Sequence, residues 1–298
     1  MDSDDERILV TGATGTVGSR VVEILAERAV TVRAATRSPD GKTVPTAEET
    51  VEFDFERPET WGAAFEGVDR VFLVRPLAIS RVGESMLPAI DAAERLTVDH
   101  VVVLSVLGAE KNPFLPHRRI EKYVQDSSLD WTFLRASFFM ENLVENHGRE
   151  IVRQGEIVVP AGDGTTSFVA AHDVAAVGAQ TMIEPGHRNQ AYDVTGSAAL
   201  TYHDVATTLE TVLDRHIEYT EPSLLRFVRH SRSIGRPWGL TLVMAGLYTT
   251  ARLGLAGRVS DDAGRVLGRP PAELSSWAKT NRDAFEAIAT RVSYRNGI

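Results

Sequence analysis

The sequence predicts an α/β fold, a doubly wound parallel sheet with a smaller, mainly C-terminal α+β lobe. Three observations lead to this prediction. Short apolar segments alternate with amphipathic ones through the first half of the chain, which is typical of β-α-β units. The apolar segment 71–74 is uninterrupted, as in parallel strands that are covered on both faces. A strand, a glycine-rich turn and a helix open the chain over residues 8–25.

The glycine-rich turn has the spacing of a loop that binds a dinucleotide. Gly12 permits a tight turn out of the strand, Gly15 lets the backbone approach a pyrophosphate, and Gly18 lets the helix pack closely on the sheet. The helix start offers free N–H groups to phosphates. We therefore expect the following residues to bind a cofactor: Gly12, Thr14, Gly15, Thr16, Val17 and Gly18. The alternative is a tight turn that binds no ligand.

Composition excludes several classes of function. The 298 residues are 43% hydrophobic and 24% charged, as in ordinary globular proteins. A net charge of −9 disfavours nucleic acid as a partner. The absence of cysteine excludes disulfides, thiolate metal sites and a cysteine nucleophile, and we expect no metal. The acidic segment 2–6 lacks the basic region of a signal peptide, so we expect a cytoplasmic protein.

The second predicted strand, 30–37, ends where a dinucleotide-binding fold meets the adenosine ribose. A protein specific for NAD usually has an acidic residue there, whereas this chain has Arg37 and Ser38. A guanidinium can bind a 2′-phosphate with two hydrogen bonds. We therefore expect NADP(H) rather than NAD(H), with Arg37 as the main contact and Arg33 as a second one. The alternative is a solvated charge at the strand end, and Asp40 lies nearby.

Three further strands are predicted at 51–55, 71–74 and 101–105. Asp54 is placed to accept a hydrogen bond from the adenine amino group, with Phe55 beside the ring; the alternative for Asp54 is a helix cap. The fourth strand ends where the phosphates and ribose would pass, at Val74, Arg75 and Pro76. The fifth ends at Ser105. Because the carboxyl ends of parallel strands share one edge, these residues would form one ligand crevice.

Several segments together resemble a known family: 11–18, 32–37, 67–74, 100–105, 131–142, 171–175 and 192–196. They are similar to the NmrA-like group of atypical short-chain dehydrogenases/reductases, over most of the chain to about residue 220. The segment 139–142 is most similar to ergot-alkaloid dehydrogenases, NADPH-dependent quinone reductases and triphenylmethane reductases. The resemblance implies an NAD(P)-binding Rossmann domain, 1–137 with 166–195 returning to the sheet, and a substrate-binding lobe of 138–165 and 196–298.

The chain departs from the wider superfamily at the Tyr-x-x-x-Lys pair that usually performs proton transfer. Alignment on Glu121 places His117 at the lysine position and Pro113 at the tyrosine position, while Tyr123 lies too far along. Hydride transfer mainly needs proximity and orientation, so an acceptor that stabilises its own charge needs no strong protein acid. We expect His117 to contact ribose or substrate and Ser105 to bond near the nicotinamide. The alternatives are an ordinary helix-start residue and a strand-end hydroxyl satisfied by the backbone.

The second half contributes the expected substrate lobe. Phe138, Phe139 and Met140 follow the sixth strand and would line an aromatic substrate; the alternative is core packing. A strand at 191–195 should join the parallel sheet, and Thr201 and Asp204 should cap a helix over 201–213. The apolar stretch 238–255 is interrupted by an arginine and is shorter than the ~20 residues of a membrane span. It would cover the substrate pocket or form an oligomer contact.

These expectations combine into one function and one alternative. The first is an NADP(H)-dependent oxidoreductase that transfers hydride to a small conjugated or aromatic acceptor, such as a quinone or imine. The alternative is a non-catalytic NADPH-binding redox sensor that acts through a protein partner. We expect a small-molecule substrate, no nucleic acid and no membrane, and leave a homodimer open.

Overall fold

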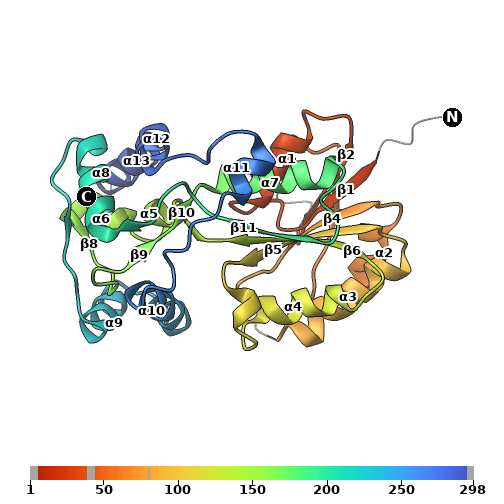
Figure 1. The fold of residues 1–298 in the computed structure, drawn as a ribbon, viewed down its shortest axis with the longest axis horizontal. Helices are drawn as coiled ribbons and strands as arrows, with labels where there is room; N and C mark the ends of the chain where they lie inside the picture. The colour runs from red at the N-terminus through yellow and green to blue at the C-terminus, as the bar shows by residue number, and fades with distance from the viewer. Residues whose placement is uncertain (1–5, 39–43, 80, 294–298) are drawn as a thin grey trace. The chain divides into compact units, whose positions relative to one another are not determined.

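The computed structural model describes residues 6–38, 44–79 and 81–293, the last three without side chains. Within these ranges the central sheet has seven parallel strands in the order β11-β6-β5-β4-β1-β2-β3 (Figure 1). The strands are β1 (Arg7–Val10), β2 (Thr31–Thr36), β3 (Glu49–Glu52), β4 (Arg70–Val74), β5 (His100–Val106), β6 (Asp130–Ala136) and β11 (Gln190–Val194). The order reverses between β1 and β4, which is where doubly wound sheets bind ligands.

Helices cover both faces of this sheet, which confirms the predicted doubly wound fold. One face carries α1 (Gly18–Leu25) and α7 (Ala171–Ile183), and the other carries α2 (Trp61–Phe65), α3 (Val82–Arg95) and α4 (Pro116–Gln125) (Figure 1). Two 3-10 turns, η1 (Pro58–Thr60) and η2 (Ala109–Lys111), and the short helix α11 (Asp262–Leu267) complete the unit. A large apolar cluster lies between the sheet and the face covered by α2, α3 and α4.

The chain separates into two compact units. Unit 1 comprises Met1–Ala136, Ala171–Val194 and Asp262–Arg269, and unit 2 comprises Ser137–Ala170, Thr195–Asp261 and Pro270–Ile298. The segment Asp262–Arg269 is a part of unit 1 that the sequence did not indicate. It is fixed there by two polar contacts: Asp262 accepts a hydrogen bond from the backbone N–H of Asp193, and Arg269 pairs with buried Asp173 at 2.7 Å.

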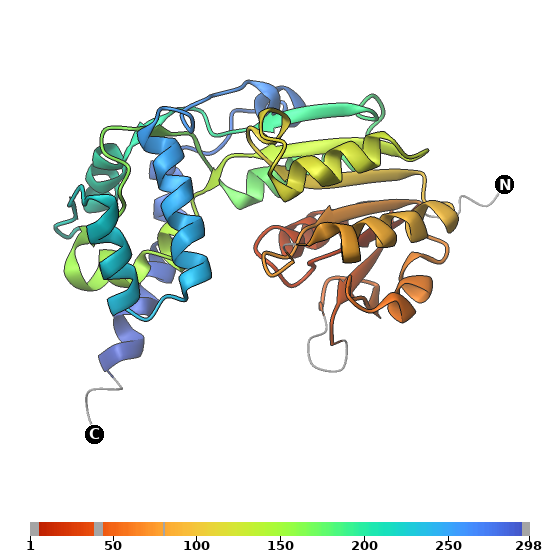
Figure 2. The same ribbon diagram turned by 90° about the horizontal axis from the view of Figure 1, so that it is seen from below.

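Unit 2 is mostly helical, with three short strand pairs (Figure 2). Its helices are α5 (Asn142–Glu145), α6 (Gly148–Gln154), α8 (Tyr202–Leu213), α9 (Leu224–Ser233), α10 (Trp238–Arg252), α12 (Leu274–Thr280) and α13 (Arg282–Ser293). The strand pairs are β7 (Phe138–Phe139) with β10 (Phe168–Val169), β9 (Thr165–Thr166) with β12 (Leu200–Thr201), and β8 (Glu156–Ile157) with β13 (Glu218–Tyr219). The predicted capping box of Thr201 and Asp204 is present at α8.

Some predicted boundaries are wrong for identifiable reasons. The third strand ends at Glu52, because Phe53 and Phe55 instead pack edge to face with each other and Phe53 packs on Phe65. The segment 155–160 is extended for only two residues, Glu156 and Ile157. The apolar stretch does form α10, and within the described residues no helix combines the length and apolar content needed to cross a bilayer.

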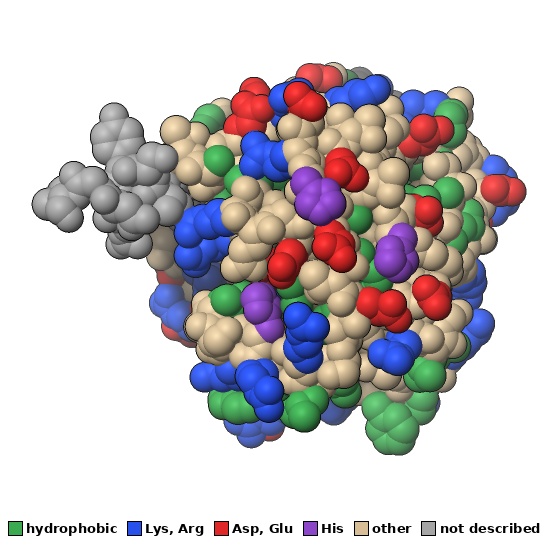
Figure 3. All heavy atoms as spheres, turned by 90° about the vertical axis from the view of Figure 1, so that its left-hand side faces the viewer, with side chains coloured by type: hydrophobic (Ala, Val, Ile, Leu, Met, Phe, Trp, Pro, Cys, Tyr) green, Lys and Arg blue, Asp and Glu red, His purple; other side chains and the backbone are tan. Residues whose placement is uncertain are grey.

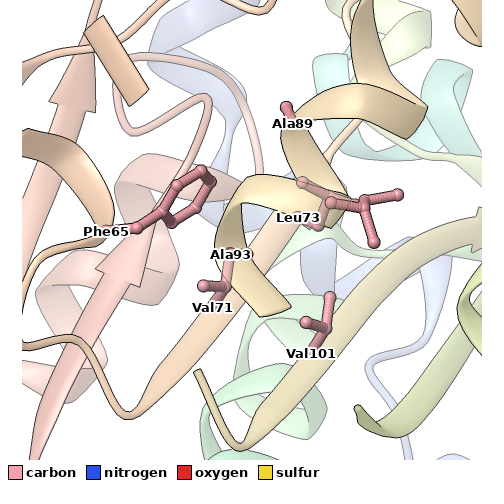
Figure 4. A pocket seen from close by; sticks show the side chains of 7 residues that line it. Phe65, Val71, Leu73, Ala89, Ala93 and Val101 are labelled. Carbon is pink, nitrogen blue, oxygen red and sulfur yellow. The ribbon is translucent and has the colours of Figure 1, made fainter. Parts of the chain in front are cut away.

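The void drawn in Figure 4 belongs to the core of unit 1. Apolar side chains from α2, β4, α3 and β5 line it, among them Phe65, Leu73 and Val101. Its volume is about 10 Å³, which is the room of at most one water molecule, and a water there would lack polar partners. We therefore assign it to packing and not to ligand binding.

Candidate active site

The end of β1 is fixed to β4 before the glycine loop begins. The hydroxyl of buried Thr11 donates to the carbonyl of Phe72 at 3.0 Å and accepts from the N–H of Val74 at 2.8 Å. Gly12 then adopts φ +63°, a left-handed conformation that favours glycine. A Cβ on Gly12 would also lie 3.2 Å from the Cβ of Val74. The loop therefore leaves the sheet at a position that only glycine fills without strain.

The loop closes on the carbonyl of Gly12. The N–H of Gly15 donates to that carbonyl at 2.8 Å, and a Cβ on Gly15 would lie 3.2 Å from it. A Cβ on Gly18 would lie only 2.2 Å away. Gly18 thus allows the first turn of α1 to rest on the loop itself, a closer contact than the helix–sheet packing predicted from spacing.

The outer side of the loop is open and has the polarity of an anion site. Gly12, Thr14 and Gly15 are exposed, Thr16 is half-buried and Val17 is buried. The first turn of α1 contains no acidic residue, and no side chain caps it. The N–H of Ser19 donates to the carbonyl of Gly15 at 3.1 Å, and the partial positive charge of the helix start is available to a phosphate. The missing side chains of the three glycines make the cradle, so these residues fit a pyrophosphate.

Arg33 in β2 and Arg37 just after that strand have different environments. The guanidinium of Arg33 binds Glu49 at 2.6 Å and donates to the carbonyls of Ala63, Ala64 and Glu66 at the end of α2. The expectation of Arg33 as a phosphate contact is therefore wrong, because that side chain caps a helix. Arg37 is exposed one residue beyond β2. Asp40, which we considered beside it, lies outside the described residues.

Ser38 and the third strand end supply further polar groups at the same edge of the sheet. The N–H of Ser38 donates to the hydroxyl of Thr36 at 3.3 Å, and the Ser38 side chain is exposed. Asp54 accepts from the N–H of Glu56 at 2.9 Å, a local turn in place of a helix cap. Phe55 is only 4% exposed and packs in the core, so its ring supports the edge of the sheet and offers little surface to a ligand.

A groove lies next to these residues in unit 1. It measures about 330 Å³ and runs between the segment after β3 and the N-terminal end of α3. Glu56, Ile79 and Ser85 are among its lining residues, and most of its wall is polar. Its size and position near Asp54 suit a polar ring system better than an apolar one.

Arg75 and His117 form a contact that connects the loop after β4 with α4. The Nε–H of Arg75 donates to Nε2 of His117 at 3.3 Å, and its Nη1 donates to the carbonyl of Ile79 at 2.7 Å. Burial, and secondarily the charge of Arg75, lower the pKa of His117 to about 4. The imidazole is therefore neutral at pH 7. Because Nε2 accepts a hydrogen bond, the ring proton is on Nδ1.

Ser105 lies in a buried network that the sequence did not indicate. Its hydroxyl donates to Oε1 of Glu121 at 2.7 Å, and both side chains are buried. Arg135 binds the same carboxylate through two nitrogens at 3.0 and 2.9 Å, and Arg118 approaches it at 3.4 Å. Ser105 is paired with Arg135 in the β5–β6 register. Alignment of these two strands is therefore the signal in the sequence that could have revealed the network. The hydroxyl retains lone pairs that can accept a further hydrogen bond.

A family model described as NAD(P)H-binding matches residues 12–185, more than half of the chain. The chain belongs to this family. The expected NAD(P)H-binding Rossmann fold is thereby confirmed. The matched range begins at the first glycine of the loop described above.

Named relatives and solved structures extend this result. An NAD(P)H azoreductase of Xenophilus azovorans is 35% identical over 286 residues, which is 94% of this chain and 99% of the relative. The fold is similar to that of an NADPH-dependent quinone oxidoreductase from Escherichia coli in complex with NADPH, with TM-score 0.83, 24% identity and coverage of 96% and 99%. It is also similar to a Citrobacter sp. triphenylmethane reductase complexed with NADP(H), with TM-score 0.81, 23% identity and coverage of 95% and 99%.

In this NAD(P)H-binding protein, the hydrogen bond of Tyr123 keeps it from acting as a proton donor. The hydroxyl of Tyr123 donates to Asp91 of α3 at 2.6 Å, and this bond to a carboxylate raises the pKa of the phenol. Pro113 is exposed in the loop before α4. Among the described residues, no group of acidic and histidine side chains could hold a metal ion.

The three predicted substrate residues lie in unit 2. Met140 is 1% exposed within the core of that unit, where the alternative of core packing fits it. Phe138 is half-buried and packs edge to face on Phe168 at 5.5 Å. Phe139 is half-buried. The two phenylalanines therefore retain some accessible ring surface.

Proposed function

We propose that the protein is an NADPH-dependent reductase that delivers hydride to a small conjugated or aromatic acceptor. The observation that carries this proposal is the glycine cradle at the start of α1, with an exposed guanidinium at Arg37 beyond β2. The azoreductase relative supports an aromatic acceptor and a nicotinamide cofactor. Relatives named as reductases, oxidoreductases and dehydrogenases give the non-catalytic sensor less support.

We assign the cofactor contacts along the carboxyl edge of the sheet. The loop 12–18 would bind the pyrophosphate, and Arg37 with Ser38 the 2′-phosphate. Asp54 and the groove beside it would accept the adenine, with Phe55 supporting that edge from the core. The segment Val74–Pro76 would pass along the ribose and phosphates. His117 and Ser105 would lie nearest the nicotinamide, where the bound cofactor supplies the hydride.

The proposed role of His117 follows from its hydrogen bonds. Neutral His117 can donate from Nδ1 to a ribose or acceptor oxygen, while Arg75 fixes the ring through Nε2. A pKa of about 4 makes His117 a poor source of a full proton at neutral pH. The proton that completes reduction therefore comes from water. This restricts the substrates to acceptors that need no proton from the protein. Quinones and azo compounds qualify because conjugation stabilises the anion formed by hydride transfer, and imines qualify because they are protonated by water beforehand.

The test is turnover of an acceptor panel by the purified protein with NADPH. The panel contains a quinone, an azo dye, a cyclic imine and a simple ketone. We expect oxidation of NADPH with one or more conjugated acceptors and none with the ketone, which needs a protein acid. Binding of NADPH without turnover of any acceptor would favour the sensor. Capture of a protein partner by only one redox form of the cofactor would then support that alternative.

The remaining assignments belong to the same proposal. We propose that unit 2 provides the substrate contacts, including Phe138, Phe139 and, through packing, Met140. Phe139→Ala should raise KM for an aromatic acceptor and leave NADPH affinity unchanged.

We further propose a cytoplasmic protein that does not bind nucleic acid, in line with its net charge of −9. Light scattering of the purified protein decides whether it is a homodimer.

A further inference from the structure

The segment 222–260 differs in charge from the rest of the protein. It contains six arginines and no aspartate, glutamate or lysine, although the whole chain has a net charge of −9. Helices α9 and α10 and the loop that follows them form this segment. We call α9, α10 and the turn between them, residues 224–252, the hairpin. The segment 222–260 is therefore cationic, although the protein as a whole is acidic.

Exposed apolar side chains concentrate in the same region. Of the thirteen large hydrophobic residues that are exposed in the described chain, eleven lie between residues 224 and 259. They are Leu224, Leu225, Ile234, Trp238, Leu240, Leu242, Val243, Leu247, Leu253, Leu255 and Val259. Single exposed hydrophobic residues are ordinary, but a concentration of this kind marks an interaction surface.

One side of α10 is apolar and uncovered by the rest of unit 2. Trp238 and Leu242 are 57 and 61% exposed, and Val243 and Leu247 are 54 and 49% exposed; the members of each pair are four residues apart on the helix. On the opposite side, Met244 and Tyr248 are buried in the core of the unit. The helix has fifteen residues, or about 22 Å, against a hydrocarbon thickness of ~30 Å. It can lie along a membrane surface but cannot cross it.

Arginines flank the exposed apolar face. Arg226 and Arg229 are exposed on α9. Near the end of α9, the guanidinium carbon of Arg232 lies 4.8 Å from the ring centroid of Trp238, the first residue of α10. Arg236 has a different task, because it binds buried Glu150 at 2.7 Å. Along the lower edge of Figure 3, side chains of Lys or Arg lie next to hydrophobic ones.

We propose that the hairpin is a docking surface for an anionic lipid membrane. The leucines and Trp238 would enter the boundary between headgroups and acyl chains, and Arg226 and Arg229 would bind headgroup phosphates. This combination of leucine, tryptophan and arginine is typical of helices that lie in a membrane interface. This mode of contact needs no spanning helix, and none is found among the described residues. We thereby depart from our sequence-based expectation that the protein has no membrane partner.

Charge argues against a second copy as the occupant. A symmetric dimer brings the same patch of both subunits together. Two hairpins would then oppose arginine-rich segments that contain no acidic residue. Anionic lipid offers the complementary charge to the arginines and an apolar phase to the leucines.

The test is flotation of the full-length protein with vesicles at low ionic strength. One set of vesicles is phosphatidylcholine alone, and the other contains equal parts of phosphatidylcholine and phosphatidylglycerol. We expect flotation with the anionic set and its loss in high salt. Tryptophan emission should shift to the blue, because Trp238 is exposed whereas Trp61 and Trp277 are buried. Trp238→Phe should remove that shift.

Two double variants separate the contributions of charge and apolar contact. Arg226→Gln/Arg229→Gln should weaken binding to anionic vesicles roughly 30-fold, about 5-fold for each arginine. Leu242→Gln/Leu247→Gln should abolish flotation. The control Arg28→Gln/Arg95→Gln removes the same charge from exposed positions of unit 1 and should float like the wild type. Unchanged NADPH affinity shows that each variant is folded.

Several results would overturn the proposal. One is failure of the wild type to float with anionic vesicles; another is equal flotation with both sets. If the leucine variant instead changes the mass in light scattering, the hairpin is a contact between copies. If it raises KM for a soluble acceptor and still floats, the hairpin covers the substrate.

Discussion

At the scale of the residue, the preference between cofactors depends on Arg37. This guanidinium is exposed at the end of β2, and Arg33 is already bound to Glu49 and to the end of α2. Arg37→Ala should therefore weaken NADPH by at least tenfold, the effect of ~1.4 kcal/mol, and leave NADH nearly unchanged. Calorimetric titration with both nucleotides measures this. Equal losses for the two would show that Arg37 does not bind the 2′-phosphate.

His117 provides a prediction about pH. Its folded-state pKa of about 4 lies below the ordinary value of 6.5, so the unfolded chain takes up the proton first as the pH falls. The contribution of neutral His117 to stability is complete above pH 6.5 and is lost as the pH falls towards 4. NMR titration should give the low midpoint in the wild type and a higher one in Arg75→Ala. That midpoint should stay below 6.5, because burial is the larger cause. An unchanged midpoint would show that Arg75 does not affect the pKa of His117.

Sequence reasoning predicts roles that are set by nearby residues in the chain. The spacing of Gly12, Gly15 and Gly18 is local, and so is the choice of arginine over acid after β2. The partners of Ser105 and Tyr123 could not be predicted in this way. They depend on strand register and on how α3 packs against α4, which lie far apart along the chain.

At the scale of the element, the contact of α1 with its loop sets the phosphate cradle. A Cβ at Gly18 would lie 2.2 Å from the carbonyl of Gly12, so Gly18→Ala must displace the helix start. We expect at least a tenfold loss of NADPH affinity by titration. Gly62→Ala is the matched control, since a Cβ there meets nothing within 4 Å. It should stabilise α2 by about 0.5–1 kcal/mol and leave binding intact.

The buried carboxylate of Glu121 connects β5, α4 and β6. It is fully buried and accepts from Ser105 and Arg135. Glu121→Ala removes the bidentate partner of Arg135, whose other ion pair, with Glu110, is longer at 3.7 Å, and should lower the free energy of unfolding by about 3–5 kcal/mol in denaturant titration. The exposed pair of Arg282 with Glu286 is the control: Glu286→Ala should cost at most about 0.5 kcal/mol. Similar losses for both variants would contradict the role of the buried network.

At the scale of the whole molecule, the parallel, doubly wound sheet was predictable and the course of the chain between units was only partly so. Apolar segments separated by helices specify a doubly wound sheet. The return of 262–269 to unit 1 depends on contacts with distant parts of the chain. Ala263 and Val266 are buried, and polar contacts join the segment to Asp173 and Asp193. No pattern in that short segment indicates where it packs.

Transfer of deuterium from NADPH labelled at the reactive nicotinamide carbon tests the central claim most directly. The cofactor carries deuterium at both positions of that carbon, and the purified protein is mixed with it and a conjugated cyclic imine, whose carbon retains the transferred deuterium, in a single turnover. The product is examined by mass spectrometry. The account predicts one deuterium in the reduced acceptor, transferred from one face of the nicotinamide, and solvent hydrogen at the other reduced position. NADPH that binds and remains unoxidised, or a product without the label, would contradict it.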